Sequence, residues 1–353
     1  MAEPKASTEL KEPKELQVLA NTQQMLCARF SPAGDVIAAG GMDGQVHRWK
    51  SGEKDFTPLP PLPARKSWLV DLAFHPDKPI LFSGDSWGAL RCHEGMDGEA
   101  RQVWELEKAH EGWLRQVAAD AQRVVSGGRD GAVRVWTHAG KPLAEWKGEE
   151  EIFCVTLHPD GKHVVFSDLK GRVRVWDFAA KKIVREMDAS FFYRYDRIQD
   201  ICGLRRLVWA DGGKTLVAAG CVPTNGATMQ AVPTVQFFDF ASGKPGQKIQ
   251  HGKETDGMIH DAMWHPGGHL IAVTSGQPGT GGVLFLRPGE DKPFYTSGKL
   301  ANCQAVALHA PSHRMAVVAT NRGSNGNGRP PGKDGEYPNN NSPVHVFALP
   351  AAS

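Results

Sequence analysis

The sequence lacks the features that mark secreted, membrane-spanning or nucleic-acid-binding proteins. Its six cysteines form no CxxC pair, and they are more scattered than those of a disulfide framework. No apolar run approaches the ~20 residues that span a bilayer, and the first residues lack the apolar core of a secretory signal. The net charge of +2 gives no broad basic surface. We therefore expect a cytoplasmic protein with reduced thiols that binds neither membrane nor nucleic acid.

Motifs that hold phosphates or dinucleotides are missing as well. The sequence has no GxxxxGK[ST] loop, and no GxGxxG that follows a strand and opens a helix. Its glycine-rich segments GGMDG and GQPGTGG are typical of turns between strands. We expect no cofactor.

The clearest pattern lies in residues 110–137, where short apolar segments alternate with turn signals. The pair Asp130-Gly131 readily takes the positive φ angles that short hairpin loops need, and the strand that follows it ends at Trp136. Trp49 and Trp176 end similar segments, about two periods before and one period after, at ~40–45 residues per period. Such a period with four short strands is the sequence signature of a propeller blade.

At these residues the chain resembles the WD-repeat (WD40) family of β-propellers. His110, Ser126, Asp130 and Trp136 of the third unit stand where that family places a hydrogen-bonded tetrad. The resemblance implies a chain of hydrogen bonds, in which Asp accepts a hydrogen bond from His, His pairs with Ser, and Ser pairs with Trp. We expect this group to be structural, although His, Ser and Asp also resemble a hydrolytic triad.

The resemblance implies an all-β fold, a seven-bladed WD40-type β-propeller of four-stranded antiparallel blades. Six or eight blades are the alternatives. In the second unit Trp87 replaces the turn Asp and His93 replaces the terminal Trp, and in the fourth unit Phe166 and Lys170 stand at the Ser and Asp positions. The last three units place large apolar residues in the Trp position, namely Phe238, Leu286 and Phe347.

Residues 15–353 are expected to form this single propeller, after a disordered tail at 1–14 that has few apolar side chains. The short apolar segment at 16–19 has no partner nearby. Propellers of this family often close the ring by lending an N-terminal strand to the last blade, so we expect that use here. A stray strand on the outside is the alternative.

Three segments break the period: 188–203, 223–233 and 321–343. The last is rich in Gly, Asn and Pro and is expected to be a mobile insertion. In a WD-type blade, inter-blade linkers and the turns between second and third strands emerge on the same rim, called the top. Insertions that gather on one face often mark the binding face.

Aromatic and basic residues also gather on the predicted top rim, and Trp, Tyr and Arg dominate the hot spots of protein interfaces. The predicted partner-binding residues are Trp68, Trp87, Trp113, Arg115, Arg129, Phe191, Phe192, Tyr193, Arg194 and Tyr195. Two alternatives stay open: Trp68 and Trp113 pack between blades, or the aromatics of the linker plug the mouth of the channel.

Charged residues recur in the first strands, which line the central channel in this family. Asp71, Arg206 and Asp261 fall at aligned places and could bind an ion or a small ligand, although hydrogen bonds between blades or channel water explain them equally. His260 and His265 lie at opposite ends of one expected strand, about 16 Å apart at ~3.3 Å per residue. They cannot share one ion, since bonds to zinc are about 2 Å long, and we expect no metal site.

The resemblance implies a non-catalytic scaffold that binds partner proteins on the top face of the propeller. The alternative is an enzyme, or a propeller that binds a metal or small ligand in its channel, with Asp71, Arg206, His260 and Asp261 near the mouth. Fold alone does not decide between them.

Overall fold

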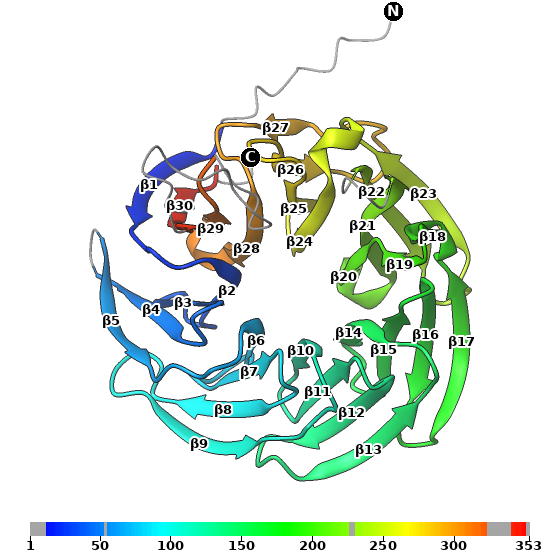
Figure 1. Cartoon of the computed structure of the whole chain (residues 1–353), viewed down its shortest axis with the longest axis horizontal. Coiled ribbons are helices and arrows are strands. Elements are labelled where there is room, and N and C mark those ends of the chain that lie inside the picture. The colour runs from blue at the N-terminus through cyan, green and yellow to red at the C-terminus, as the bar shows by residue number, and fades with distance from the viewer. Residues whose placement is uncertain (1–11, 53–54, 226–229, 323–339, 351–353) are drawn as a thin grey trace, which may run out of the picture.

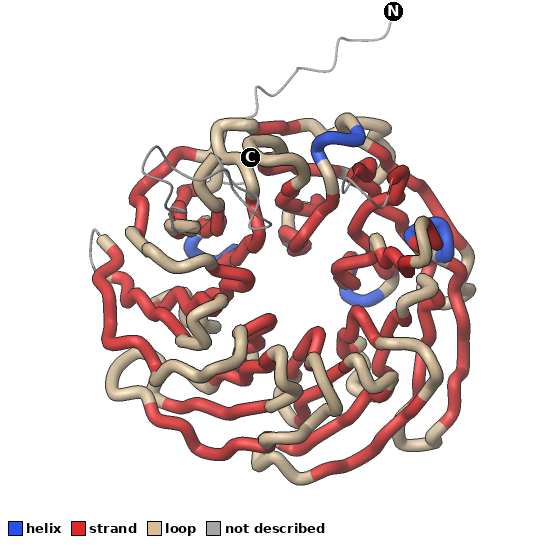
Figure 2. Tube along the Cα trace, in the orientation of Figure 1, coloured by secondary structure: helices blue, strands red, loops and turns tan. Residues whose placement is uncertain are grey.

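The computed structural model describes residues 12–52, 55–225, 230–322 and 340–350. Seven four-stranded antiparallel sheets surround a central opening, each with its first strand innermost (Figure 1). Strands, turns and short 3-10 helices make up this part of the chain (Figure 2). The predicted seven-bladed, all-β propeller is confirmed. Residues 1–11 of the predicted tail and 323–339 of the predicted mobile insertion lie outside the described residues.

The first three blades follow each other along the chain with no interruption. Blade one consists of β2 (Met25–Phe30), β3 (Val36–Gly41), β4 (Val46–Ser51) and β5 (Phe56–Leu62). Blade two consists of β6 (Leu69–Phe74), β7 (Leu81–Asp85), β8 (Leu90–Glu94) and β9 (Arg101–Leu106). Blade three consists of β10 (Leu114–Ala119), β11 (Arg123–Gly128), β12 (Ala132–Thr137) and β13 (Pro142–Lys147).

Blades four to six have the same strand order, with short 3-10 helices in linkers and turns. Blade four consists of β14 (Ile152–Leu157), β15 (His163–Asp168), β16 (Arg172–Asp177) and β17 (Lys182–Asp188). Blade five consists of β20 (Leu204–Ala210), η2 (Asp211–Gly213), β21 (Thr215–Asn225), β22 (Gln230–Asp239) and β23 (Pro245–Gln250). After η3 (Glu254–Asp256), blade six consists of β24 (Met258–His265), β25 (His269–Ser275), β26 (Gly282–Leu286) and β27 (Tyr295–Ser297).

The seventh blade joins the two ends of the chain. It consists of β28 (Cys303–His309), η4 (Ala310–Ser312), β29 (Arg314–Ala319), β30 (Val344–Ala348) and β1 (Lys14–Leu19), in the sheet order β1-β30-β29-β28. The register pairs Leu19 with Val344 and Lys14 with Ala348. Leu19 is buried in one apolar cluster with Val344 and Val346. The predicted closure by an N-terminal strand is confirmed, and the strand begins at Lys14.

The core lies between neighbouring blades, because the inner strands are apolar on both faces. One cluster, for example, joins Val125 and Val135 of blade three to Val155 and Phe166 of blade four. Outer strands are half exposed, and β5 tolerates three prolines because an edge strand can do without some backbone donors.

The structure also supports the predicted Trp positions of the later units. Trp136 is paired with Val124 of the second strand, and the corresponding pairs are Leu216 with Phe238, Leu270 with Leu286, and Met315 with Phe347. A large apolar side chain is therefore kept at this place even where the indole N–H is absent.

Two of the predicted interruptions have regular structure. The linker 188–203 contains η1 (Ser190–Phe192) and a hairpin of β18 (Tyr193–Asp196) and β19 (Gln199–Cys202), which Figure 1 shows in front of blades four and five. The described parts of the segment 223–233 extend β21 and β22, with Pro223 paired to Ala231. The face that carries the inter-blade linkers is here called the top face.

Candidate functional site

The top face of blades two and three carries a cluster of indole rings. The Trp68 and Trp113 rings meet edge to face with their centroids 5.7 Å apart. Trp68 and Ser86 exchange hydrogen bonds of 2.9 and 3.0 Å, which holds the neighbouring turn residue Trp87 close by. Trp87 is 63% exposed and Trp68 is 40% exposed. Two linkers and a turn thus bring three tryptophans to one place, and two of them are exposed.

Two arginines border these rings. The guanidinium of Arg115 lies 4.8 Å from the ring centre of Trp113 and 4.9 Å from that of Phe153, and it also forms an ion pair with Glu151. Arg129 donates its backbone N–H to the Trp113 carbonyl at 2.8 Å. We call Trp68, Trp87, Trp113, Arg115 and Arg129 the Trp–Arg patch. Stacked aromatic and guanidinium groups of this kind offer a partner apolar area and hydrogen-bond donors together.

The linker hairpin contributes a second exposed group. Tyr195 is 60% exposed and Ile198, at the tip, is 90% exposed. The side chain of Arg194 is 45% exposed. Lys170 fastens the hairpin base through hydrogen bonds of 2.8 Å to Tyr193 and Asp200, and these contacts raise the pKa of the Lys170 ammonium.

One predicted binding residue has to be corrected. Phe192 is 0% exposed and belongs to the core between blades four and five, so a partner cannot reach its side chain. Its neighbour Phe191 is half-buried against the same core, with the Lys248 ammonium 5.0 Å from its ring centre. The linker aromatics therefore divide into a buried anchor and an exposed hairpin, which composition alone does not reveal.

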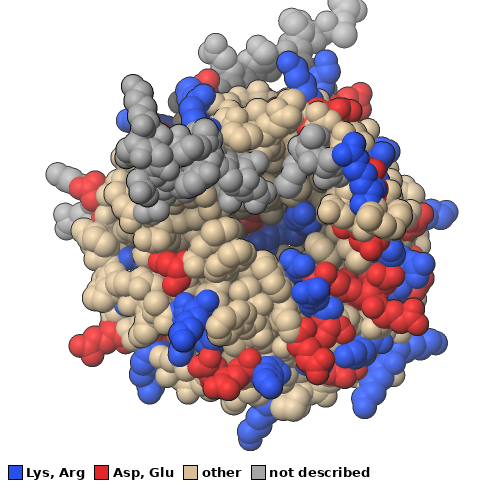
Figure 3. Space-filling view, in the orientation of Figure 1, with Lys and Arg blue, Asp and Glu red and all other residues tan. Residues whose placement is uncertain are grey.

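Charge on the top face is mixed. Figure 3 shows basic side chains around the central opening, and a broad uncharged area over blades two and three. Acidic and basic side chains alternate over blades four and five in the same view. An area poor in charge with arginines near it resembles the core and rim of a protein interface.

The predicted channel residues form one ion-pair network. Arg29 of blade one lies 2.8 Å from Asp261 of blade six and 3.4 Å from Asp71 of blade two. Arg206 of blade five lies 3.0 Å from Asp71 and 2.7 Å from Asp261. The two carboxylates also accept backbone N–H groups of blades three and seven.

This network saturates the channel carboxylates. Burial by itself raises the pKa of Asp261, but Arg206 and Arg29 outweigh burial and hold it below its usual value. Burial and the nearby Arg205 lower the pKa of His260 to about 3, so that this ring is neutral near pH 7. Two cations and two anions cancel, and the geometry ties blades together across the channel. A further cavity of about 410 Å³ lies against Arg29 and Arg206 and is lined mainly by the ends of first strands.

The residues of the expected tetrad are hydrogen-bonded in one chain. Asp130 Oδ1 lies 2.9 Å from His110 Nδ1, His110 Nε2 lies 2.7 Å from Ser126 Oγ, and the Trp136 indole donates to Ser126 Oγ at 3.0 Å. Arg134 adds an ion pair of 2.7 Å to Asp130. His110 and Ser126 are 2% and 0% exposed, so no substrate reaches this Ser–His pair.

Blades two and four use a different aspartate, which position matching along the sequence misses. Asp85 and Asp168 stand two residues before the turn position, and each accepts an ion pair from the third-strand arginine, Arg91 at 2.8 Å and Arg174 at 2.7 Å. Both also accept backbone N–H groups of their own turn. The signal that could have found them is an Asp that ends the second strand together with an Arg six residues later.

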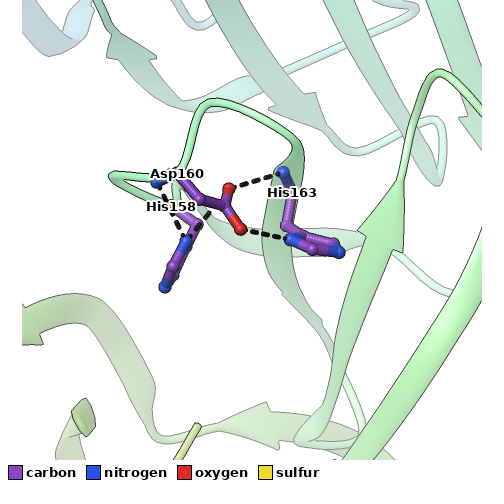
Figure 4. A group of neighbouring side chains, drawn as sticks. All are labelled: His158, Asp160 and His163. Atoms are coloured by element: carbon purple, nitrogen blue, oxygen red, sulfur yellow. Dashed lines mark hydrogen bonds and ion pairs between the residues drawn. The ribbon is translucent and has the colours of Figure 1, made fainter. Parts of the chain in front are cut away.

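One side-chain group among the described residues has metal-ligand geometry. It consists of His158, Asp160 and His163, whose ligand atoms lie within 4.8 Å of one another (Figure 4). Asp160 lies 3.0 Å from His158 Nδ1 and 2.7 Å from His163 Nδ1. Partial burial raises the pKa of Asp160, but hydrogen bonds from the Lys162 backbone and His163 outweigh it and lower that pKa to about 2.

The nitrogens of His158 are already occupied. Its Nε2 lies 3.0 Å from the Gly213 carbonyl of blade five, and its Nδ1 accepts the backbone N–H of Asp160 at 3.1 Å. His75 and His265 accept a backbone N–H two residues later in the same way. This histidine is therefore a recurrent clamp of the turn, and only Asp160 and His163 remain for an ion, too few for a zinc site.

The cysteines are buried thiols. All six are free, and burial raises the pKa of each of them to about 11 or 12. Such thiols are poor nucleophiles near pH 7. Within the described residues, no helix has the length and apolar character needed to cross a bilayer.

Three segments of the chain match a family model described as "WD domain, G-beta repeat": residues 13–50, 101–137 and 140–177. Each match begins with an outer strand and ends with a third strand, so the sequence repeat is offset by one strand from the blade. Because of this offset, the first repeat begins with β1, and β1 is the outer strand of blade seven.

The curated relatives are distant and match only in part. The chain is 29% identical over 103 residues to Kinesin-like protein KIF21A of Homo sapiens, which covers 29% of this chain and 6% of that protein. It is 25% identical over 162 residues to Pre-mRNA-splicing factor cwf17 of Schizosaccharomyces pombe, covering 34% and 47%. It is 24% identical over 155 residues to Angio-associated migratory cell protein of Homo sapiens, covering 39% and 32%. The matches therefore span less than half of each of these relatives.

Proposed function

Because the chain is a WD40-repeat β-propeller, and such propellers are typically protein-interaction scaffolds, we propose that it binds a partner protein on its top face and catalyses no reaction. The observation that carries this proposal is the Trp–Arg patch, in which Trp87 is 63% exposed beside the paired rings of Trp68 and Trp113. Large exposed aromatics cost solubility unless a partner covers them.

The chemistry of the patch favours a protein over a small molecule. Trp and Arg supply most of the binding energy in protein interfaces, and they do so in apolar areas from which water is excluded. Here the rings spread over two linkers and a turn, so they present a surface to be covered. Tyr195 and Ile198 of the linker hairpin add exposed apolar area over blades four and five.

The reactive groups elsewhere in the molecule are engaged in structural contacts, which also supports a scaffold. Ser126 and His110 are buried within the tetrad. The channel carboxylates are neutralised by Arg29 and Arg206. A ligand that bound to these carboxylates would have to displace the ion pairs, which makes a channel site built on Asp71 and Asp261 less favourable.

The test compares two exposed apolar residues in different places. Trp87→Ala removes the most exposed ring of the patch, whereas Leu143→Ala removes a 50% exposed apolar side chain from the outer strand β13. Each variant is used as bait beside the unchanged chain, with quantitative mass spectrometry of the captured proteins. Truncation of an interface hot spot costs ~2 kcal/mol or more, so we expect a loss of about 30-fold in affinity for Trp87→Ala and no change for Leu143→Ala.

A second pair of variants addresses the rest of the top face. Arg129→Ala within the patch and Tyr195→Ala on the exposed hairpin should both weaken capture of the same partner. If Trp87→Ala, Tyr195→Ala and Arg129→Ala all recover the same proteins in the same amounts as the unchanged chain, the top-face proposal is wrong.

A further inference from the structure

Blades two and three have the same backbone framework but different side chains inside it. In blade three the linker residue His110 donates its backbone N–H to the turn glycine Gly88 of the preceding blade at 2.9 Å. In blade two Arg65 makes the same bond to Gly44 at 3.2 Å. Arg65 therefore occupies the position of the tetrad histidine.

The third strands show a matching replacement. His93 is paired with Leu81 in the β7–β8 register, just as Trp136 is paired with Val124 in β11–β12. The serine partner is kept, because Ser83 Oγ lies 3.1 Å from His93 Nε2. An imidazole thus stands in blade two where blade three has the larger indole.

Both replacements leave space between blades one and two. The Arg65 side chain is 40% exposed and extends outward to Gln102 and Glu105, at 2.6 and 3.2 Å, instead of filling the blade. A cavity of about 240 Å³ results. Its walls include Val46, Leu62 and Leu69 on the apolar side and Ser83, Arg91 and His93 on the polar side.

The polar wall of the cavity contains a hydrogen-bonding atom that is not satisfied by the described chain. His93 is 5% exposed, and its Nδ1 is buried and makes no hydrogen bond to any described residue. A buried polar atom without a hydrogen-bond partner is unfavourable, so a ligand that bonds to it gains affinity. Arg91, by contrast, is fully engaged by Asp85 and Glu105, each at 2.8 Å, so its charge is not free to bind an anion.

We propose that this cavity between blades one and two is a binding site for one small, neutral, planar aromatic molecule that carries a single N–H or O–H group. An apolar cavity of ~150 Å³ holds benzene, and drug-sized ligands need ~300–1,000 Å³. The cavity lies between these limits and suits a molecule the size of indole. The ligand supplies from solution the ring that blade three supplies from its own chain.

Titration with two matched probes tests the site. Indole has one N–H group, and 1-methylindole has the same ring without it. Isothermal titration calorimetry of the full chain should give saturable binding of one indole per chain, with 1-methylindole about tenfold weaker because one hydrogen bond is lost. The melting temperature should rise with indole concentration, because the ligand binds the folded state.

Variants assign that binding to the cavity. His93→Trp inserts the indole of blade three, so it should abolish indole binding and raise the melting temperature. Leu62→Phe narrows the cavity from the opposite wall, so it should also weaken indole binding. It provides the test if His93→Trp does not fold. Leu143→Ala, on the outer strand of blade three, should bind indole as the unchanged chain does.

Two results would overturn the proposal. If neither probe binds the unchanged chain up to its solubility limit, the cavity holds only water. If indole binds His93→Trp and Leu62→Phe as tightly as it binds the unchanged chain, the site lies elsewhere. Neither result bears on the top-face partner, because His93 and Leu62 are buried residues outside the Trp–Arg patch.

Discussion

Arg29 of blade one donates a hydrogen bond of 2.8 Å to Asp261 of blade six, a residue 232 positions further along the chain. Arg206 completes the network from blade five. The carboxylates are buried and the arginines are mostly buried, so their attraction is strong but their desolvation is costly. The network as a whole therefore contributes little net stability, but the loss of one of its charges should destabilise the closed ring strongly.

We predict that Asp261→Ala strongly destabilises the protein. The change leaves Arg29 and Arg206 to share Asp71, with one buried positive charge in excess. Removing one partner of a buried ion pair costs about 3–5 kcal/mol. Urea denaturation followed by tryptophan fluorescence measures the loss in the free energy of unfolding.

The double variant Arg206→Met with Asp261→Leu is the control for this prediction. It removes one cation and one anion together and keeps the Arg29–Asp71 pair. Its free energy of unfolding should lie well above that of Asp261→Ala, because no charge is left unpaired. Equal losses in the two proteins would show that packing, rather than charge, explains the effect.

The tetrad of blade three should tolerate the loss of its serine poorly. Ser126→Ala removes the acceptor of the Trp136 indole and the partner of His110, so two buried polar groups lose a hydrogen bond. We expect a loss of about 2 kcal/mol in the free energy of unfolding. Ser83→Ala in blade two affects His93 alone and should cost less. A larger loss for Ser83→Ala than for Ser126→Ala would contradict this account.

The folded state should lose stability in mild acid because of His93. Burial lowers the pKa of this imidazole from 6.5 to about 4. The unfolded chain takes up the proton first, so the contribution is complete above about pH 6.5 and is lost as the pH falls toward about 4. The shift corresponds to roughly 3 kcal/mol at most.

Comparison of the unchanged chain with His93→Gln isolates this contribution. His260 and His269, whose pKa values are lowered to about 3 and about 4, act in the same direction in both proteins. The free energy of unfolding should therefore fall less steeply between about pH 7 and pH 4 in His93→Gln. Identical slopes would show that His93 is not the titrating group.

The repeat pattern was sufficient to predict the number of blades and the closure of the ring. Phe238, Leu286 and Phe347 could be assigned to the Trp position because burial at this place constrains size and polarity more than it constrains residue type. Asp71, Arg206 and Asp261 could be aligned for the same reason, since the first strands share one register. The sequence could not show that these charges would pair with Arg29, because that contact crosses the channel.

Side-chain direction limited the rest of the sequence prediction. Asp85 and Asp168 pair with the same third-strand arginine that Asp130 contacts in blade three, but they stand two residues earlier in the repeat. An alignment by position therefore treats the aspartate as missing. Phe192 and Tyr195 lie in one aromatic segment, yet the first is buried and the second is 60% exposed. Which aromatic becomes buried depends on the hairpin that follows. That hairpin could not be recognised in the sequence, because its turn, Arg197-Ile198, lacks the usual turn residues.

That hairpin turn stores strain that a substitution should release. Arg197 and Ile198 both have positive φ angles, 48° and 61°. In a two-residue hairpin loop these positions favour Asn and Gly, because a β-branched side chain clashes with the backbone there. Ile198→Gly should therefore raise the free energy of unfolding of the hairpin by about 1 kcal/mol. Hydrogen exchange of the Asp196 and Gln199 amides, which flank the turn, measures this change directly.

The same variant separates the strain of the turn from its role in binding. Ile198 is 90% exposed, so Ile198→Gly removes apolar area from the top face while it stabilises the hairpin. If Ile198 makes no contact with the partner, Ile198→Gly will bind that partner unchanged or better. Slower exchange together with weaker capture of the partner would instead show that the strained isoleucine contacts that partner. Faster exchange would show that the turn is not strained by its positive φ angles.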